Sequence, residues 1–209
     1  MRIAIFGATG RTGIPLCEQA LERGHEVIAH VRSPEKLPFS EERVTVVEGD
    51  VYTGRGVTEA VEDADAVVSV LGQTDGSPDD LLDVAGKHII GAMNEAGVSR
   101  FVTLVGAGVR EEGEKVSLGG KVMGVLLRLL ARSVLEDAKH HVETVEKTDF
   151  AWTVVRVPRL GEGSPSEEYR AGDIDLGFDA VDRADVAMFI LDCLEDEEYI
   201  RKMPKVGPV

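Results

Sequence analysis

A doubly wound α/β fold built on a parallel β-sheet is predicted by three features of the sequence. Short apolar runs alternate with longer amphipathic stretches along the whole chain, a pattern typical of a parallel sheet covered by helices on both faces. A glycine-rich turn directly follows the first apolar run. The 209 residues, 43% of them hydrophobic, suffice for one sizeable core, and no Pro/Gly/Ser-rich linker divides them. We therefore predict a single domain over residues 1–209.

The predicted strands and helices account for nearly the whole chain. Six strands are expected, at Ile3–Phe6, Glu26–Val31, Val44–Val47, Ala66–Leu71, Phe101–Val105 and Trp152–Val157. Helices are expected at Thr12–Arg23, Val57–Val61, Asp79–Ala96, Gly120–Ser133, Leu135–Lys147 and Arg183–Leu194. Gly97 is expected to end the third helix, because glycine readily adopts the left-handed conformation found there. This order predicts a Rossmann-type sheet with strand order 3-2-1-4-5-6, to which Tyr199–Val206 could add an edge strand.

The least patterned stretch is Gly161–Asp179, which is rich in glycine, serine and proline. It follows the carboxyl end of a predicted strand, the edge at which α/β sheets bind ligands. We therefore expect a small flap on the substrate side of the sheet at residues 161–179.

The chain is strongly acidic, with 38 Asp and Glu residues against 23 Lys and Arg residues and a formal net charge of −15. Such a field repels nucleic acid and anionic membrane surfaces, so neither is expected as a partner. The most apolar run, Val122–Ala131, is too short to span a bilayer and contains Arg128. Met1 and Arg2 lead directly into the first strand with no signal peptide. We expect a soluble, cytoplasmic protein; its oligomeric state, and whether its acidity reflects a salt-rich habitat, stay open.

Cysteine and histidine give no sign of a metal site. Cys17 and Cys193 fall in apolar helical patterns, where a small buried hydrophobe is the expected role. His140 and His141 are adjacent on a predicted helix, so their side chains point about 100° apart and cannot both bind one metal ion. With no third ligand at a useful spacing, we expect a solvated helix face there, on which at most one histidine could donate a proton.

The glycine-rich turn Gly7-Ala8-Thr9-Gly10-Arg11-Thr12-Gly13 joins the first strand to the first helix. Glycine allows both a tight reversal and a close approach of backbone N–H groups to a pyrophosphate, and the helix N-terminus adds partial positive charge. The position of the three glycines between a β run and an amphipathic helix is the context that makes this motif specific. We therefore predict a nicotinamide dinucleotide, bound by Gly7, Thr9, Gly10, Arg11, Thr12 and Gly13.

The end of the second strand indicates which dinucleotide is bound. An NAD site usually ends this strand with Asp or Glu, which binds the adenosine ribose. Here the sequence reads His30-Val31-Arg32-Ser33, with no carboxylate until Glu35. Arg32 carries a planar, always charged guanidinium suited to a 2′-phosphate, and Ser33, Lys36 and Arg11 could assist. NADP(H) is therefore favoured over NAD(H); the alternative is that Arg32 is only a solvated loop residue.

Further strand ends are expected to complete the dinucleotide site. Asp50 and Val51 are placed at the adenine edge, although Asp50 could instead cap the next helix. Leu71 and Gly72 follow the fourth strand, where a glycine lets the backbone pass beneath a ribose. The strand-five end supplies Val105 and Gly106.

Together these motifs resemble the atypical short-chain dehydrogenase/reductases, in particular the NAD(P)-binding group that includes NmrA-like proteins and the flavin (biliverdin-IXβ) reductases. The resemblance spans almost the whole chain, and the matching motifs are Gly7–Gly13, Val31–Leu37, Gly49–Val51, Arg100–Val102, Trp152–Arg156 with Pro158, and Asp182–Ala187. It implies a Rossmann fold, an NAD(P) cofactor, and reduction of a flavin, quinone or small carbonyl compound.

One departure from that group concerns the catalytic acid. Standard short-chain dehydrogenases place Tyr and Lys four residues apart on a helix, where the lysine lowers the pKa of the phenol. The residues four positions after Tyr52, Tyr169 and Tyr199 are Gly56, Asp173 and Met203, so no such pair exists. The hydroxyl expected at the end of the fifth strand is also replaced, by Val105 and Gly106; Thr103, two residues earlier, is expected to be buried and structural. The catalytic residues therefore stay unassigned.

Hydride transfer by positioning is the chemistry that remains, because flavins and quinones accept hydride without a dedicated protein acid. We expect Pro158, Arg159 and Leu160 to frame the acceptor, and Tyr169 and Phe178 to stack on it. The alternatives are that Arg159 is a surface ion-pair partner and that the aromatic rings close a hydrophobic seam. A second functional hypothesis is a non-catalytic NADP-binding redox sensor that acts through a protein partner.

Overall fold

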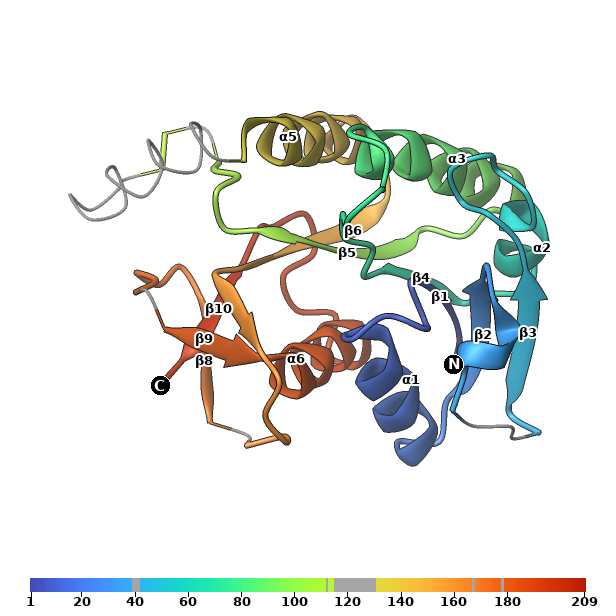
Figure 1. Cartoon of the computed structure of the whole chain (residues 1–209), viewed down its shortest axis with the longest axis horizontal. Coiled ribbons are helices and arrows are strands. Elements are labelled where there is room, and N and C mark those ends of the chain that lie inside the picture. The colour runs from blue at the N-terminus through green and yellow to red at the C-terminus, as the bar shows by residue number, and fades with distance from the viewer. Residues whose placement is uncertain (39–41, 112, 115–130, 167, 178) are drawn as a thin grey trace.

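The structure is a computed structural model of the chain that describes residues 1–38, 42–111, 113–114, 131–166, 168–177 and 179–209. An eight-stranded sheet with the order β3-β2-β1-β4-β5-β6-β10-β8 runs through its centre (Figure 1). The predicted order of the first six strands is confirmed. The strands are β1 (Arg2–Phe6), β2 (Glu26–Val31), β3 (Val44–Glu48), β4 (Ala66–Ser69), β5 (Arg100–Gly106), β6 (Ala151–Val157), β8 (Tyr169–Gly172) and β10 (Lys205–Pro208).

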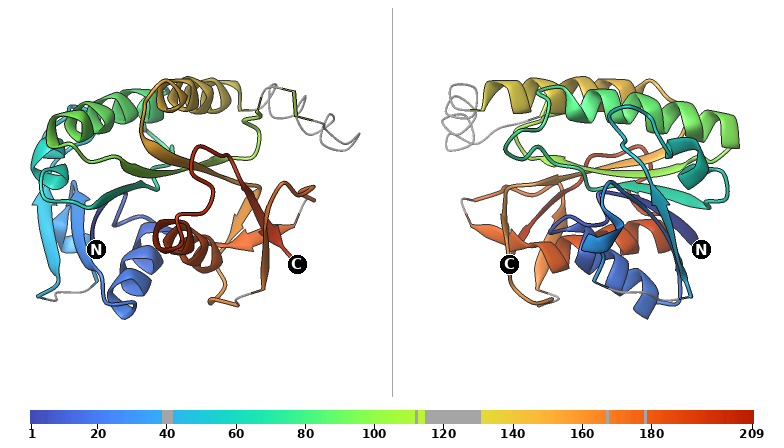
Figure 2. Two further views of the ribbon diagram at one scale, coloured as in Figure 1. Left: turned by 180° about the vertical axis from the view of Figure 1, so that it is seen from behind. Right: turned by 45° about the vertical axis from the view of Figure 1, so that its right-hand side comes forward.

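Helices cover both faces of this sheet (Figures 1 and 2). One layer holds α1 (Gly13–Glu22) and α6 (Arg183–Glu195), and the other holds α2 (Val57–Val61), α3 (Leu81–Ala96) and α5 (Arg132–Glu146). The alternation of side chains along β1 explains the two layers: Ile3 and Ile5 join the apolar core beneath α1, whereas Ala4 and Phe6 join the core beneath α3. The central strands are therefore apolar on both faces.

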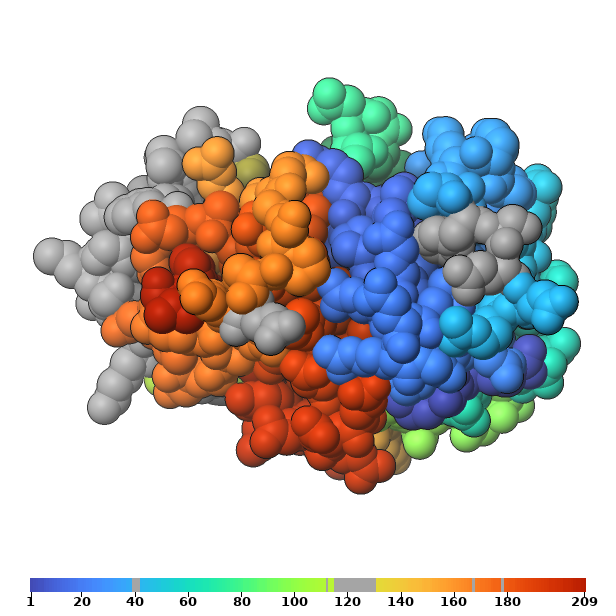
Figure 3. Space-filling model, turned by 90° about the horizontal axis from the view of Figure 1, so that it is seen from below, coloured from blue at the N-terminus to red at the C-terminus, as the bar shows by residue number. Residues whose placement is uncertain are grey.

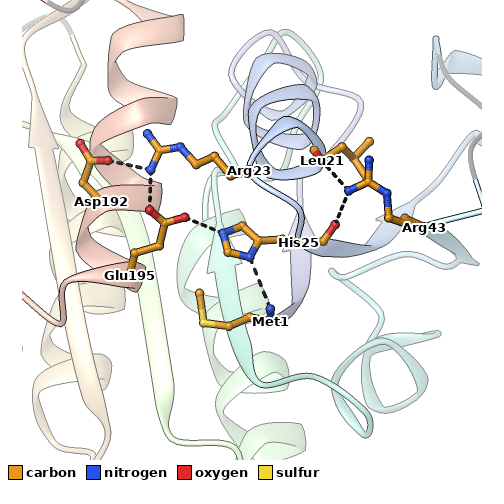
Figure 4. Close-up of polar contacts among 7 residues, drawn as sticks. All are labelled: Met1, Leu21, Arg23, His25, Arg43, Asp192 and Glu195. Atoms are coloured by element: carbon orange, nitrogen blue, oxygen red, sulfur yellow. Dashed lines mark hydrogen bonds and ion pairs between the residues drawn. The ribbon is translucent and has the colours of Figure 1, made fainter.

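Polar contacts fasten α1 to α6 at the edge where the parallel strands begin. Arg23 donates hydrogen bonds to Asp192 at 2.7 Å and to Glu195 at 2.8 Å, and His25 Nε2 lies 2.7 Å from the Glu195 carboxylate (Figure 4). Seen from outside the layer formed by α1 and α6, the blue N-terminal residues and the orange and red C-terminal residues lie side by side (Figure 3). The candidate site lies at the opposite edge of the sheet, where the parallel strands end.

The C-terminal part of the sheet differs from the prediction. An added strand is confirmed, but it is β10, which lies parallel to β6, and β8 pairs with it in antiparallel orientation as the outermost strand. Within residues 161–179, the stretch predicted as a flap, Tyr169–Gly172 forms β8 and so belongs to the sheet. Two short strands, β7 (Arg159–Gly161) and β9 (Ala180–Asp182), form a separate parallel pair at its borders. The alternation in Tyr-Arg-Ala-Gly covers only four residues, which is too short to indicate a strand, and so β8 escaped prediction.

The helix boundaries agree closely with the sequence. The helix α3 ends at Gly97, which adopts φ +72° and donates its N–H to the Met93 carbonyl, as predicted. A short 3₁₀ helix (Pro34–Lys36) follows β2. The helix predicted at Gly120–Ser133 lies mostly outside the described residues.

Candidate functional site

The glycine-rich turn is held by close backbone packing between β1 and α1. Gly7 has φ +90°, and its carbonyl oxygen accepts a hydrogen bond from the Gly10 N–H at 2.8 Å. A Cβ on Gly13 would overlap the Gly7 carbonyl oxygen and lie 2.8 Å from the Ala8 Cα. Thr12, the N-cap residue of α1, is buried but makes no side-chain capping bond, so its hydroxyl does not occupy the N–H groups of the first turn. This is the backbone arrangement that a pyrophosphate requires.

The ends of β4 and β5 lie beside this turn. A Cβ on Gly7 would come within 3.1 Å of the Val70 carbonyl oxygen, so the segment leaving β4 passes directly against the glycine turn. Leu71 is half-buried, and a Cβ on either Gly72 or Gly106 would meet no described atom within 4 Å. Open space next to bare backbone therefore borders both strand ends. The structure brings these predicted residues to one edge, as the parallel topology requires.

On the adenosine side, Arg32 follows β2 and is exposed, with no hydrogen-bond or ion-pair partner in the described part of the chain. Ser33 is half-buried at the start of the 3₁₀ helix. Asp50 does not cap α2; its Oδ1 accepts the Tyr52 N–H at 3.0 Å within the loop after β3. Val51 is buried beside it, and its carbonyl oxygen lies 2.9 Å from His88 Nδ1.

His30 is a residue at this side that the sequence did not single out. It is 4% exposed, its Nε2 donates to the Arg55 carbonyl at 2.9 Å, and its ring lies 4.9 Å from that of Phe6. Burial is the main cause of a lowered pKa for His30. Its position within the run Val27–Val31, where the other four residues are apolar, was the available signal.

Beyond the ends of β5 and β6, the chain carries the residues that were predicted to frame an acceptor. Val105 is buried, and the Ala107 N–H that follows Gly106 donates to the Val157 carbonyl at 2.7 Å. Pro158 and Leu160 are half-buried. Arg159 is exposed and has no carboxylate partner in the described ranges, so the alternative of an ion pair finds no support there.

Tyr169 is placed differently from the prediction. Its hydroxyl donates to Asp192 on α6 at 2.7 Å, and its ring packs edge-on against Phe189 with centroids 5.9 Å apart. Asp192 also binds Arg23 near the end of α1 where the strands begin. The side chain therefore closes a seam against α6, the alternative considered for it, and is not placed for stacking on an acceptor. The other predicted aromatic residue, Phe178, lies outside the described residues.

The two adjacent histidines on α5 have separate environments. His140 is exposed as expected, but the expectation of a solvated face is wrong for His141, which is 2% exposed. Its Nε2 lies 2.9 Å from the Thr103 hydroxyl, which confirms Thr103 as a buried structural residue. Burial lowers the pKa of His141 to about 4, and the Asp83 carboxylate and Leu82 carbonyl oppose this only in part. The signal was available, because His141 shares the spacing of the buried Ala138 and Val145.

The match that decides the family covers most of the chain. The family model described as NAD(P)H-binding matches residues 7–197, from the first glycine of the turn to the residues after α6. This chain belongs to the NAD(P)H-binding family.

Relatives of this NAD(P)H-binding protein are similar over part of their length. The uncharacterized protein YwnB of Bacillus subtilis is 35% identical over 108 residues, which cover 52% of this chain and 48% of that protein. The photosystem II assembly factor Ycf39 of Synechocystis is 35% identical over 106 residues, or 49% of this chain and 32% of that protein. The chain thus spans about half or less of these curated relatives.

Solved structures resemble the NAD(P)H-binding chain over its full length. A putative epimerase from Bacteroides thetaiotaomicron is 27% identical with a TM-score of 0.79, covering 100% of this chain and 97% of that one. ChuY, an anaerobillin reductase from Escherichia coli O157:H7, is 19% identical with a TM-score of 0.79 and the same coverage. The likeness to ChuY is one of fold.

In this NAD(P)H-binding chain, α5 supplies a buried carboxylate that sequence reasoning missed. Asp137 accepts the backbone N–H groups of Leu82 and Asp83, both at 2.9 Å, and the Gln73 amide at 2.8 Å. It therefore caps α3 from a neighbouring helix and fixes the loop that carries Gly72. No local pattern signals this, because the partners are more than 50 residues apart.

The two thiols are buried as predicted. Burial raises the pKa of Cys17 and that of Cys193 to about 12, which makes both poor nucleophiles. In the described part of the chain, no group of three or more His, Cys, Asp or Glu residues could hold a metal ion. No helix found there is long and apolar enough to cross a bilayer.

Thr103→Val should destabilise the protein by roughly 1–3 kcal/mol, because it leaves the buried His141 Nε2 without a partner while conserving volume. Urea unfolding at pH 7 measures the change. The control is Thr45→Val on the edge strand β3, where Thr45 is exposed and an effect within about 0.5 kcal/mol is expected. Equal effects of the two substitutions would contradict a structural Thr103–His141 bond.

Proposed function

We propose that the protein is an NADPH-dependent oxidoreductase that transfers hydride to a flavin-, quinone- or small carbonyl-type acceptor without a Tyr/Lys pair. The observation that carries the proposal is the convergence of the glycine turn, the open backbone at Gly72 and Gly106, and the end of β6 at one edge of the sheet. The likeness to the anaerobillin reductase ChuY supports the reaction class by analogy of fold alone.

The residues present fit a dinucleotide. The turn offers N–H groups that no Thr12 side-chain bond occupies, and glycine at positions 7, 10 and 13 keeps the approach free of side chains. When bound, the nicotinamide supplies the hydride. The chain holds the phosphates at the turn, Arg32 binds the 2′-phosphate, and the segments after β5 and β6 orient the acceptor.

Binding by Arg32 predicts cofactor selectivity. Arg32→Gln should weaken NADPH binding by about 1.5–3 kcal/mol, because a charge-assisted contact to the 2′-phosphate is lost, and should leave NADH binding nearly unchanged. Isothermal titration calorimetry with both cofactors measures the difference. Arg170→Gln on the outermost strand β8 is the control for loss of one positive charge. An unchanged preference in Arg32→Gln would show that another residue selects the cofactor.

Turnover tests the catalytic half of the proposal. Purified protein should oxidise NADPH, followed at its nicotinamide absorbance, with at least one member of a panel of flavins, quinones and small carbonyl compounds. The background rate of NADPH oxidation is measured with acceptor but no protein, and with protein but no acceptor. Binding of NADPH without oxidation across the whole panel would contradict the catalytic proposal.

A second candidate function is a non-catalytic NADP-binding redox sensor that acts through a protein partner. It is favoured by the missing Tyr/Lys pair and by Thr103, whose hydroxyl is buried against His141 and is not available to a reactant. This function predicts selective binding of oxidised over reduced cofactor without turnover. Equal affinity for NADP⁺ and NADPH would contradict it.

The proposed partner is a small-molecule acceptor in the cytoplasm. The net charge of −15 supports the exclusion of nucleic acid and anionic membranes as partners. Retention on anionic vesicles or on duplex DNA at physiological salt would contradict this part of the proposal.

A further inference from the structure

We propose that Arg11 and Arg183 form a phosphate-binding pair that Glu162 occupies in the ligand-free chain, so that Glu162 competes with the phosphates of the dinucleotide. The inference rests on the dinucleotide binding proposed above. It assigns a role in affinity to a residue on the segment that follows β7, outside the glycine turn itself.

One carboxylate oxygen joins the two arginines. Glu162 Oε1 accepts a hydrogen bond from Arg11 Nη1 at 2.9 Å and another from Arg183 Nη1 at 2.9 Å. Arg183 Nη1 also donates to the Gly161 carbonyl at 3.0 Å. Arg11 lies in the glycine turn and Arg183 begins α6, so Glu162 bridges two segments that are far apart in the sequence.

The charge of this cluster is incompletely balanced, because two guanidinium groups share a single carboxylate. Burial and then the proximity of Arg11 lower the pKa of Arg183, which indicates that the two cations face one another. A phosphate group offers more acceptor oxygens than the one that Glu162 presents, and arginine binds phosphate with paired N–H donors. In a chain with a net charge of −15, two arginines directed at one point beside the dinucleotide turn favour an anionic ligand.

The backbone on which Glu162 lies is fixed, whereas its side chain is free to leave. The Gly163 N–H donates to Asp182 at 2.8 Å, and Ser166 donates to Asp185 through its N–H at 2.8 Å and its hydroxyl at 2.7 Å. These bonds attach residues 161–166 to the start of α6. The side chains of Glu162 and Arg11 are 61% and 72% exposed, so a change of rotamer separates them without unfolding the segment.

The test is Glu162→Gln in the full chain, with the dissociation constants of NADPH and NADH measured by isothermal titration calorimetry. Removal of an exposed competing carboxylate is expected to tighten binding about two- to fivefold. A gain for both cofactors assigns the pair to the pyrophosphate, and a gain for NADPH alone assigns it to the 2′-phosphate. The control is Glu143→Gln on α5, an exposed residue of the opposite helix layer that makes the same change in net charge.

Arg11→Gln separates competition from a general charge effect. In that background the gain from Glu162→Gln should fall toward that of Glu143→Gln, because one of the two arginines that the carboxylate occupies is gone. A gain in Glu162→Gln no larger than in Glu143→Gln, or a gain undiminished without Arg11, overturns the inference. If the unaltered chain binds neither cofactor, the proposed function fails as well; if it binds them and only the Glu162 effect is missing, this inference fails alone.

Discussion

Gly13→Ala is expected to lower the affinity for NADPH by at least about tenfold, or about 1.4 kcal/mol, and to destabilise the fold. The added Cβ would overlap the Gly7 carbonyl oxygen and lie 2.8 Å from both the Cα and the carbonyl carbon of Ala8. All three are backbone atoms, so the turn itself must shift. Forcing a methyl group into such a position costs roughly 1–3 kcal/mol. The displaced N–H groups would then no longer converge on a phosphate.

Calorimetry with NADPH and urea unfolding measure the two effects of Gly13→Ala separately. Gly91→Ala on α3 is the matched control, because a Cβ there meets no described atom within 4 Å. Alanine in a helix interior is favoured over glycine by about 1 kcal/mol, so this control should be stabilised with unchanged affinity. If Gly13→Ala bound NADPH like the unaltered chain, the turn would not be the phosphate site.

The sequence predicted the parts of the fold and site that depend on contiguous residues. The run Ile3–Phe6, the glycine turn and the helix after it are adjacent, so apolar periodicity and glycine spacing suffice to place them. The strand order follows from alternation of strands and helices together with the handedness of their connections. By the same reasoning, Leu71, Gly72, Val105 and Gly106 were expected at the edge where the strands end.

What escaped prediction depends on contacts between distant segments. Asp137 caps a helix that begins more than 50 positions earlier, and Arg11 meets Glu162 across 151 positions. Tyr169 joins α6 because β8 adds to the sheet, and the four residues of β8 are too few for their alternation to indicate a strand.

A buried ion cluster beneath the loop after β5 gives the second large expected effect. Arg156 on β6 is 2% exposed and donates to the Met203 carbonyl at 2.8 Å, to the Val109 carbonyl at 3.2 Å, and to Glu114. Lys205 lies 2.7 Å from the other Glu114 oxygen. Two largely buried cations therefore share this carboxylate, which also ties the described residues after Gly106 to the sheet.

Glu114→Gln is expected to destabilise the protein by roughly 3 kcal/mol at pH 7, because removal of one partner leaves buried charges uncompensated. Glu111 and Asp173 do not replace it, since they lie 3.8 Å from Arg156 and 3.4 Å from Lys205 with side chains 46% and 98% exposed. Urea unfolding measures the loss. Glu136→Gln, which breaks the exposed pair with Arg132 on α5, is the control and should cost no more than about 0.5 kcal/mol.

The Glu114 carboxylate should also change how the stability of the protein depends on pH. Burial by itself raises the pKa of Glu114, but hydrogen bonds from Lys205 and Arg156 outweigh it and lower the pKa to about 2, from an ordinary value of 4.5. A group whose pKa is lower in the folded state stabilises the fold above its ordinary pKa, and that contribution is lost as the pH falls from about 4.5 to about 2. Urea unfolding across this range should show a shallower decline for Glu114→Gln than for the unaltered chain. Parallel declines, or an unchanged stability of Glu114→Gln at pH 7, would mean that solvent already screens the two cations and that Glu114 does not hold the loop.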